Sequence, residues 1–232
     1  MDNSGTFDVV FANYGMPGLF VQEPAGRWVN VATERGIAVD GRYDTCAMAD
    51  VDHDGHLDLY INGTVTQGRN WPDYLYRSDG SAYVVATPAA LAAIPADHGA
   101  QWADLNGDGS ADLAITGQGP HSVMFNVLPP EIARRSVQVR VLDARGRATR
   151  AGAEVRVYAA GTRRLLGTRL VDAGSGYDAQ SDLPVHLGIA SPGRVDIEVT
   201  WPAGGVRQVT LKRGVAPGVQ VIEVRTAARR AP

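Results

Sequence analysis

The chain has 232 residues, of which 44% are hydrophobic and 20% charged, so it is long enough for one large or two small domains with buried cores. Its single cysteine, Cys46, excludes a small module held together by internal disulfides. The net charge of -3 conceals an asymmetry, because residues 1–130 carry 5 Lys and Arg against 16 Asp and Glu, whereas residues 131–232 carry 17 against 9. The arginines of the basic half are scattered without an aromatic platform, so no nucleic-acid partner is expected.

No membrane span is predicted, because no apolar run approaches the roughly 18 residues that a span needs. Residues 1–5 have neither a basic nor an apolar segment, so they do not form a signal peptide. A cytoplasmic location therefore stays open from the sequence alone.

The first predicted element is an acidic loop at the start of the chain, called here the first loop (residues 2–8). Asp2, Ser4 and Asp8 stand around Gly5 in the spacing of a cation-binding loop, but no residue precedes them at its first position. Whether this loop binds an ion stays open. Because the chain begins inside the loop, we expect the natural protein to have further repeats before it. Short apolar runs follow and predict strands at 9–11, 18–21 and 28–31.

The second loop (residues 50–58) concentrates four carboxylates in nine residues: Asp50, Asp52, Asp54 and Asp58. A like-charge pair about 4 Å apart costs about 1 kcal/mol in water and several times more near a protein surface, so a cation is expected among them. Oxygen ligands without cysteine favour Ca²⁺ over zinc, and His56 would add its backbone carbonyl. Gly55 supplies the sharp turn. The alternative is an Asp- and Gly-rich hairpin turn without an ion.

The third loop (residues 104–112) repeats this pattern after predicted strands at 59–61, 74–76 and 83–85, a short helical turn at 89–94 and a strand at 98–102. Its expected side-chain ligands are Asp104, Asn106, Asp108 and Asp112, and Ser110 would add its backbone carbonyl.

The loops repeat at intervals of 50 and 54 residues, measured between Gly5, Gly55 and Gly109, which is typical of propeller blades. We predict an all-β fold that begins with a partial β-propeller of about two blades over residues 1–130. Two blades cannot close a ring of about four to eight, so open blade edges are expected to favour self-association.

A β-sandwich is predicted for residues 131–232, beyond the double proline at 129–130. Apolar and polar residues alternate along 136–142, 153–158, 194–201, 206–211 and 220–224, which indicates antiparallel sheets.

Both parts resemble known families. The Asp-x-Asp-x-Asp-Gly-x-x-Asp-Leu pattern at 50–59 resembles the FG-GAP/VCBS repeats of calcium-loaded β-propellers. The segments 151–155, 174–177, 180–181, 186–189 and 201–204 resemble the ASPIC/UnbV domain. The order matches cartilage-acidic-protein-like proteins and the UnbV proteins of enediyne gene clusters. This resemblance implies Ca²⁺ binding and an extracellular or cell-surface interaction module whose partner is a protein or a glycan.

Motifs for catalysis are sparse. The chain has no Gly-x-Ser-x-Gly motif and no glycine-rich phosphate loop. Cys46 with His98 could supply a nucleophile and a base, but a lone cysteine before a strand is typical of a small buried hydrophobe. His186 is expected to be a core or edge histidine, and Trp102 and Trp201 core anchors.

The alternative function is an enzyme or accessory protein in natural-product biosynthesis, which rests on the UnbV setting alone. A pocket between the repeats and the sandwich that holds His186 and other polar groups would favour this alternative. Bare loops and a flat polar surface would favour the interaction module.

Overall fold

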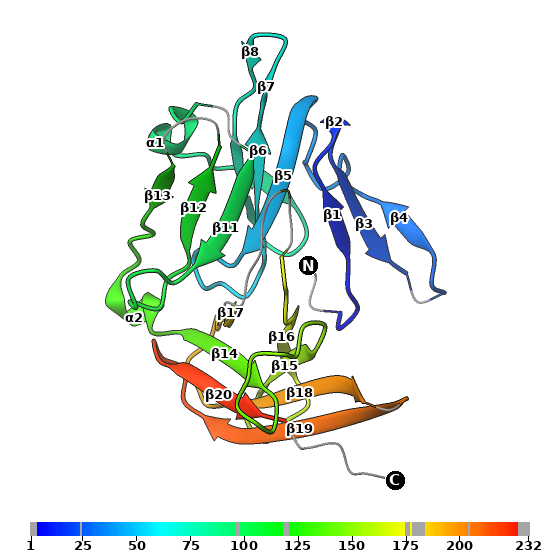
Figure 1. Cartoon of the computed structure of the whole chain (residues 1–232), viewed down its shortest axis with the longest axis vertical. Helices are drawn as coiled ribbons and strands as arrows, with labels where there is room; N and C mark the ends of the chain where they lie inside the picture. Colours follow the sequence, from blue (N-terminus) through cyan, green and yellow to red (C-terminus); the bar gives the residue numbers. More distant parts are fainter. Residues whose placement is uncertain are drawn as a thin grey trace.

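A computed structural model describes residues 4–23, 25–95, 98–117, 121–174, 177, 184–203 and 205–226. Strands dominate this part of the chain, and its two helices, α1 (Ala89–Ala92) and α2 (Pro130–Ala133), have four residues each (Figure 1). The predicted all-β class is confirmed, with a series of short antiparallel sheets followed by a two-sheet sandwich.

The first sheet contains β1 (Val9–Phe11), β3 (Gly18–Gln22) and β4 (Trp28–Asn30), in the order β1-β3-β4. These strands follow the three apolar runs predicted from the sequence.

The second sheet has the order β10-β9-β6-β5-β2. The strands are β2 (Tyr14–Gly15), β5 (Gly41–Ala49), β6 (Asp58–Gly63), β9 (Tyr74–Ser78) and β10 (Tyr83–Val85). The long strand β5 has no counterpart among the predicted strands, because Asp44 and Thr45 interrupt its apolar pattern. A separate hairpin of β7 (Val65–Thr66) and β8 (Arg69–Asn70) projects from this sheet.

The third sheet has the order β11-β12-β13, from β11 (Gly99–Ala103), β12 (Asp112–Thr116) and β13 (Ser122–Met124). The three sheets stand side by side in Figure 1, with β5 adjacent to both β1 and β11. Strand β6 explains this stacking, because its alternating side chains enter two cores. Leu59 and Ile61 pack with the first sheet, whereas Tyr60 packs with Leu113 and Ile115 of the third.

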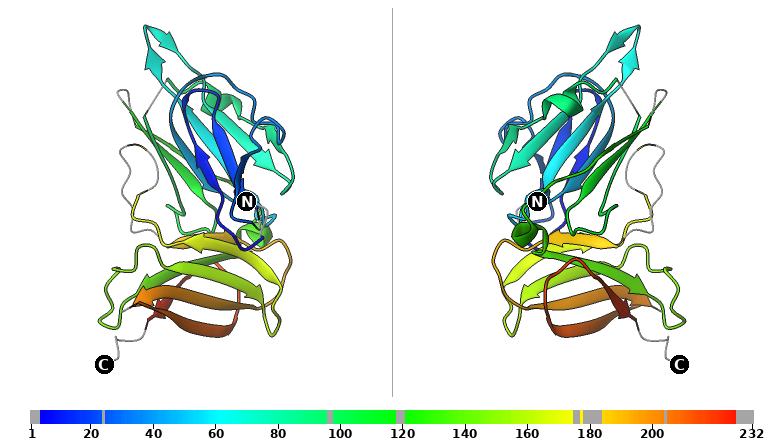
Figure 2. Two further views of the ribbon diagram at one scale, coloured as in Figure 1. Left: turned by 90° about the vertical axis from the view of Figure 1, so that its right-hand side faces the viewer. Right: turned by 90° about the vertical axis from the view of Figure 1, so that its left-hand side faces the viewer.

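The sandwich lies beyond α2 and consists of two layers (Figure 2). One layer has the order β17-β14-β20, with β14 (Ser136–Leu142), β17 (Val185–Gly188) and β20 (Val221–Arg225). The other has the order β16-β15-β18-β19, with β15 (Glu154–Ala159), β16 (Leu165–Leu170), β18 (Val195–Ala203) and β19 (Val206–Val215). All pairs are antiparallel except β14 with β20, which run parallel.

Alternation along these strands directs one face of each layer into a common core that includes Val137, Val155, Ile197 and Trp201. Trp201 is thus the core anchor that the sequence predicts. The boundary between residues 130 and 131 stays a prediction, although α2 begins there with Pro130, a residue suited to a first helical position. Asp2 and residues 180–181 lie outside the described residues.

Candidate functional site

The second loop connects β5 to β6, which are antiparallel neighbours. Asp50 follows the last residue of β5 and Asp58 is the first residue of β6, so both carboxylates lie at the same end of the sheet. Gly55 adopts φ 93, a left-handed conformation that few other residues tolerate. The sequence therefore folds into a tight loop whose ends bring the first and last acidic residues together.

Backbone amides of the loop and its neighbour hold these two carboxylates. Asp50 accepts hydrogen bonds from the amides of Asp54 (3.1 Å) and Gly55 (2.9 Å). Asp58 accepts from the amides of Val51 (2.9 Å) and of Ser78 on β9 (2.8 Å). Both side chains are 1% exposed, so the loop orients them rigidly.

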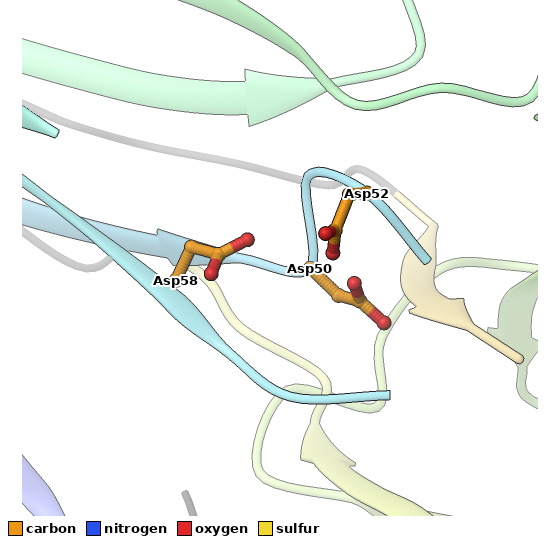
Figure 3. Close-up of side chains that lie close together, drawn as sticks. All are labelled: Asp50, Asp52 and Asp58. Carbon is orange, nitrogen blue, oxygen red and sulfur yellow. The ribbon is translucent and has the colours of Figure 1, made fainter. Parts of the chain in front are cut away.

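Three of the four predicted carboxylates converge. Oxygen atoms of Asp50, Asp52 and Asp58 lie within 4.8 Å of one another (Figure 3). Burial raises the pKa of Asp50, and it raises the pKa of Asp58 to about 7. Oδ1 of Asp52 is buried and has no hydrogen-bond partner. The cluster therefore combines buried negative charge with an unsatisfied oxygen, an arrangement that a cation stabilises.

Arg77 of β9 is the cation that contacts this cluster in the structure. Its guanidinium pairs with Oδ2 of Asp52, and its Nε lies 3.3 Å from Oδ1 of Asp58. Burial lowers the pKa of Arg77, against the opposing effect of the Asp50 charge. Arg77 was not among the site residues predicted from the sequence, because no local pattern links β9 to the second loop.

Asp54 and His56 lie outside the cluster of three carboxylates. Oδ1 of Asp54 accepts a hydrogen bond of 2.8 Å from the amide of His56. The proposed contribution of the His56 carbonyl stays a prediction.

The third loop connects β11 to β12 with a similar hydrogen-bond scaffold. Asp104 accepts from the amides of Gly107 (2.8 Å) and Gly109 (3.0 Å). Asp112 accepts from the amides of Leu105 (2.9 Å) and Asn126 (2.9 Å), as Asp58 does from Val51 and Ser78. Gly109 has φ 97, close to the value of Gly55. The internal repeat predicted from spacing therefore extends to individual hydrogen bonds.

The carboxylates of the third loop converge less closely. Within the described residues, the Asp50, Asp52 and Asp58 group is the one acidic cluster with metal-ligand spacing. Asp108 accepts hydrogen bonds from the Asn106 side chain (2.9 Å) and the Ser110 amide (2.7 Å). Burial by itself would raise the pKa of Asp108, but these hydrogen bonds outweigh burial and lower it.

The first loop retains part of the scaffold. Gly5 has φ 88, and Asp8 accepts a hydrogen bond of 3.3 Å from the amide of Gln22 on β3. Gln22 follows Asp8 by the same interval that separates Asn126 from Asp112. Ser4 bonds to Thr6 through their hydroxyl oxygens, 2.8 Å apart.

The third loop contacts the sandwich, and the second loop contacts α2. Nε2 of Gln138 on β14 donates to Oδ2 of Asp104 (2.6 Å), and Nε2 of His186 on β17 donates to the Gly109 carbonyl (2.9 Å). Nδ1 of His53 donates to the carbonyl of Ile132 in α2 (2.8 Å). His53 adopts φ 58, which is uncommon for a residue with a side chain, whereas Gly107 at the equivalent loop position has φ 77. The acidic loops thus lie between the short sheets and the sandwich.

Cys46 and His98 do not form the nucleophile and base pair that their residue types would allow. Nδ1 of His98 lies 2.7 Å from Oδ2 of Asp44, whereas burial raises the pKa of the Cys46 thiol to about 11. A thiol with such a pKa is a weak nucleophile near neutral pH.

Comparisons with known proteins match both halves of the chain. Residues 1–61 match the FG-GAP-like repeat, and residues 144–225 match ASPIC and UnbV. The chain is 25% identical over 228 residues to cartilage acidic protein 1 of Xenopus tropicalis, covering 94% of this chain and 34% of that protein. It is 24% identical over 227 residues to cartilage acidic protein 1 of Homo sapiens, covering 94% of this chain and 33% of that protein. The chain spans about a third of the length of the curated relatives it matches.

Proposed function

We propose that this chain, which carries an FG-GAP-like repeat and an ASPIC and UnbV domain and is homologous to cartilage acidic protein 1, is a calcium-stabilised interaction module that works outside the cell or at its surface. The observation that carries the proposal is the buried cluster of Asp50, Asp52 and Asp58 on a scaffold that recurs in the third loop.

The donor set fits calcium. Carboxylate, amide and carbonyl oxygens are the ligands that Ca²⁺ prefers, whereas Mg²⁺ demands a tighter octahedron and retains water. The unpartnered Oδ1 of Asp52 offers an oxygen to an ion without the loss of a hydrogen bond. The proposed ligands are Asp50, Asp52, Asp54, the His56 carbonyl and Asp58 in the second loop, Asp104, Asn106, Asp108, the Ser110 carbonyl and Asp112 in the third, and Asp2, Ser4 and Asp8 in the first.

Calcium in these loops would have a structural role and not a catalytic one. The loops contact α2, β14 and β17 through hydrogen bonds, so an ion that orders them would also order the junction with the sandwich. We take residues 1–130 and 131–232 as the two domains that the junction joins. A rigid pair of domains presents a preorganised surface, which suits recognition of a protein or a glycan. Within the described residues, neither helix has the length that a transmembrane segment requires.

A second candidate function draws support from a polar cavity at the same junction. The cavity holds about 310 Å³, and His186, Gln138 and Arg169 are among the residues that line it. A cavity of this kind is the feature that would favour an accessory or enzymatic role with a small molecule.

Calorimetric titration of the full chain with calcium tests the first candidate directly. We expect saturable calcium binding that is at least about tenfold tighter than magnesium binding. Asp52→Asn should lower the calcium affinity of the second loop. Asp172→Asn, which lies outside the loops, should leave calcium affinity unchanged. The absence of saturable binding of either ion would contradict the proposal.

A further inference from the structure

The cavity at the junction is built from both halves of the molecule. The sheet side contributes Gln101 and Trp102 of β11, and the sandwich side contributes Gln138, Arg140, Arg169 and His186. Its volume of about 310 Å³ lies at the lower end of the roughly 300–1,000 Å³ usual for ligand sites. Such a space suits a molecule the size of one sugar.

Two arginines of the wall form no ion pair with a described residue. The Arg140 side chain makes no hydrogen bond with another described residue, and the Arg169 side chain donates to the Thr168 carbonyl alone, at 2.9 Å. Burial lowers the pKa of Arg169 to about 10, although the charge of Asp50 opposes this effect. The Asp50 charge compensates this guanidinium only in part, because no ion pair joins the two residues, so an anion that enters beside the guanidinium would stabilise it further.

The acidic residues of the wall have other partners. Asp104 accepts hydrogen bonds from Gln138 and the third loop, and Asp172 accepts from the amide of Gly174 at 2.9 Å. Their charges still disfavour a dianion such as phosphate, whereas their remaining oxygen lone pairs can accept hydrogen bonds from hydroxyl groups.

Two buried ring nitrogens on wall residues also have no partner. Nε2 of His186 donates to the Gly109 carbonyl, so in the neutral ring Nδ1 is an acceptor, and it is buried without a donor. Burial keeps this ring neutral by lowering the pKa of His186 to about 4. Nε1 of Trp102 is a buried donor without an acceptor. Both nitrogens are closed to solvent, so a ligand with hydroxyl groups would satisfy them once the two side chains turn toward the cavity.

We propose that this cavity binds a small polyhydroxylated carboxylic acid of the sugar-acid class, with its carboxylate on Arg140 and Arg169 and its hydroxyls on His186 and Trp102. This site goes beyond the calcium-stabilised module, because none of these four residues is a proposed calcium ligand. The acid would contact both β11 and the sandwich and so connect the two sides of the junction.

The test uses the full chain and glucuronate as the probe. Three matched probes separate the contributions: glucose has the hydroxyls without the acid, acetate has the acid without the hydroxyls, and inorganic phosphate carries the higher charge. Calorimetry measures the affinity of each probe. We expect glucuronate to bind at least about tenfold more tightly than each of the other three.

Arg140→Gln should weaken glucuronate binding about tenfold or more, and Arg169→Gln should act in the same direction if it folds. Arg164→Gln, on an exposed loop, is the matched control and should leave binding unchanged. Equal affinity for glucuronate and glucose, an Arg140→Gln variant that binds normally, or no binding of glucuronate at millimolar concentration would each overturn the proposal. Titrations with calcium and with a chelator separate this outcome from the fate of the calcium proposal.

Discussion

Gln138 on β14 donates a hydrogen bond of 2.6 Å from Nε2 to Oδ2 of Asp104, the first carboxylate of the third loop. These residues lie 34 positions apart, on opposite sides of the junction between the short sheets and the sandwich. Gln138 is 5% exposed, whereas Asp104 is half-buried and keeps the amides of Gly107 and Gly109, so loss of the Gln138 amide would remove a bond that ties Asp104 to the sandwich. The loop and the sandwich therefore share one hydrogen-bond network.

We expect Gln138→Ala to destabilise the whole chain by about 1–3 kcal/mol, because a partly buried hydrogen bond to a charged group is lost. Chemical denaturation of the full chain measures this change. Gln220→Ala, at an exposed position, is the matched control and should have little effect. Equal stability of the two variants would show that the network does not hold the junction.

Calcium should raise the melting temperature of the chain, and a chelator should lower it. A ligand that binds the folded state alone adds about 2.7 kcal/mol at a hundredfold excess over its dissociation constant. Magnesium at the same concentration serves as the control and should give a smaller rise. If neither calcium nor chelator moves the melting temperature, the loops do not hold the ion.

The carboxylates of the second loop should contribute unequally. Asp58 is buried within the cluster of three carboxylates, whereas Asp54 lies outside it. We therefore expect Asp58→Asn to weaken calcium binding more than Asp54→Asn, as measured by calorimetric titration. The asparagine variants keep the side-chain volume, which limits unfolding. A larger loss in Asp54→Asn would mean that the ligand assignment is wrong even if calcium binds.

Arg77 should compete with calcium for the second loop, because its guanidinium contacts Asp52 and Asp58. Arg77→Gln removes this charge, so we expect several-fold tighter calcium binding and a lower melting temperature in the presence of a chelator. Arg164→Gln, on an exposed loop, is the charge-matched control. Weaker calcium binding in Arg77→Gln would indicate instead that the arginine supports the site.

The open ends of the sheet stack should promote self-association. Phe125 and Val127, beyond β13, are 59% and 88% exposed, and Trp28 on the outer strand β4 is 42% exposed. We expect the average mass from light scattering to rise with concentration, and Phe125→Ser to reduce this rise. A monomer at high concentration, with a sharp melt and no binding of a dye for apolar surfaces, would contradict this expectation.

Local features of the fold could be predicted from the sequence. Loop turns depend on residues a few positions apart, since a glycine must occupy the left-handed position and the first carboxylate caps amides within five residues. Strands with regular alternation, such as 136–142, were likewise predicted, because a period of two is a local property of the extended chain. Strand β5 escaped prediction because Asp44 and Thr45 interrupt its apolar pattern, and their partners, His98 and the amide of Tyr177, are distant in sequence.

The junction was decided by tertiary structure alone. Arg77 reaches Asp52 from β9, His186 reaches Gly109 across 77 positions, and Arg140 and Arg169 come to one cavity from different layers of the sandwich. No local pattern encodes such meetings, because they depend on how whole sheets pack against one another. By itself, the sequence determined that acidic loops exist and where they turn. Tertiary packing determined that Arg77 contacts the second loop, that the amide of Ser78 binds Asp58, and that the loops lie next to the junction cavity.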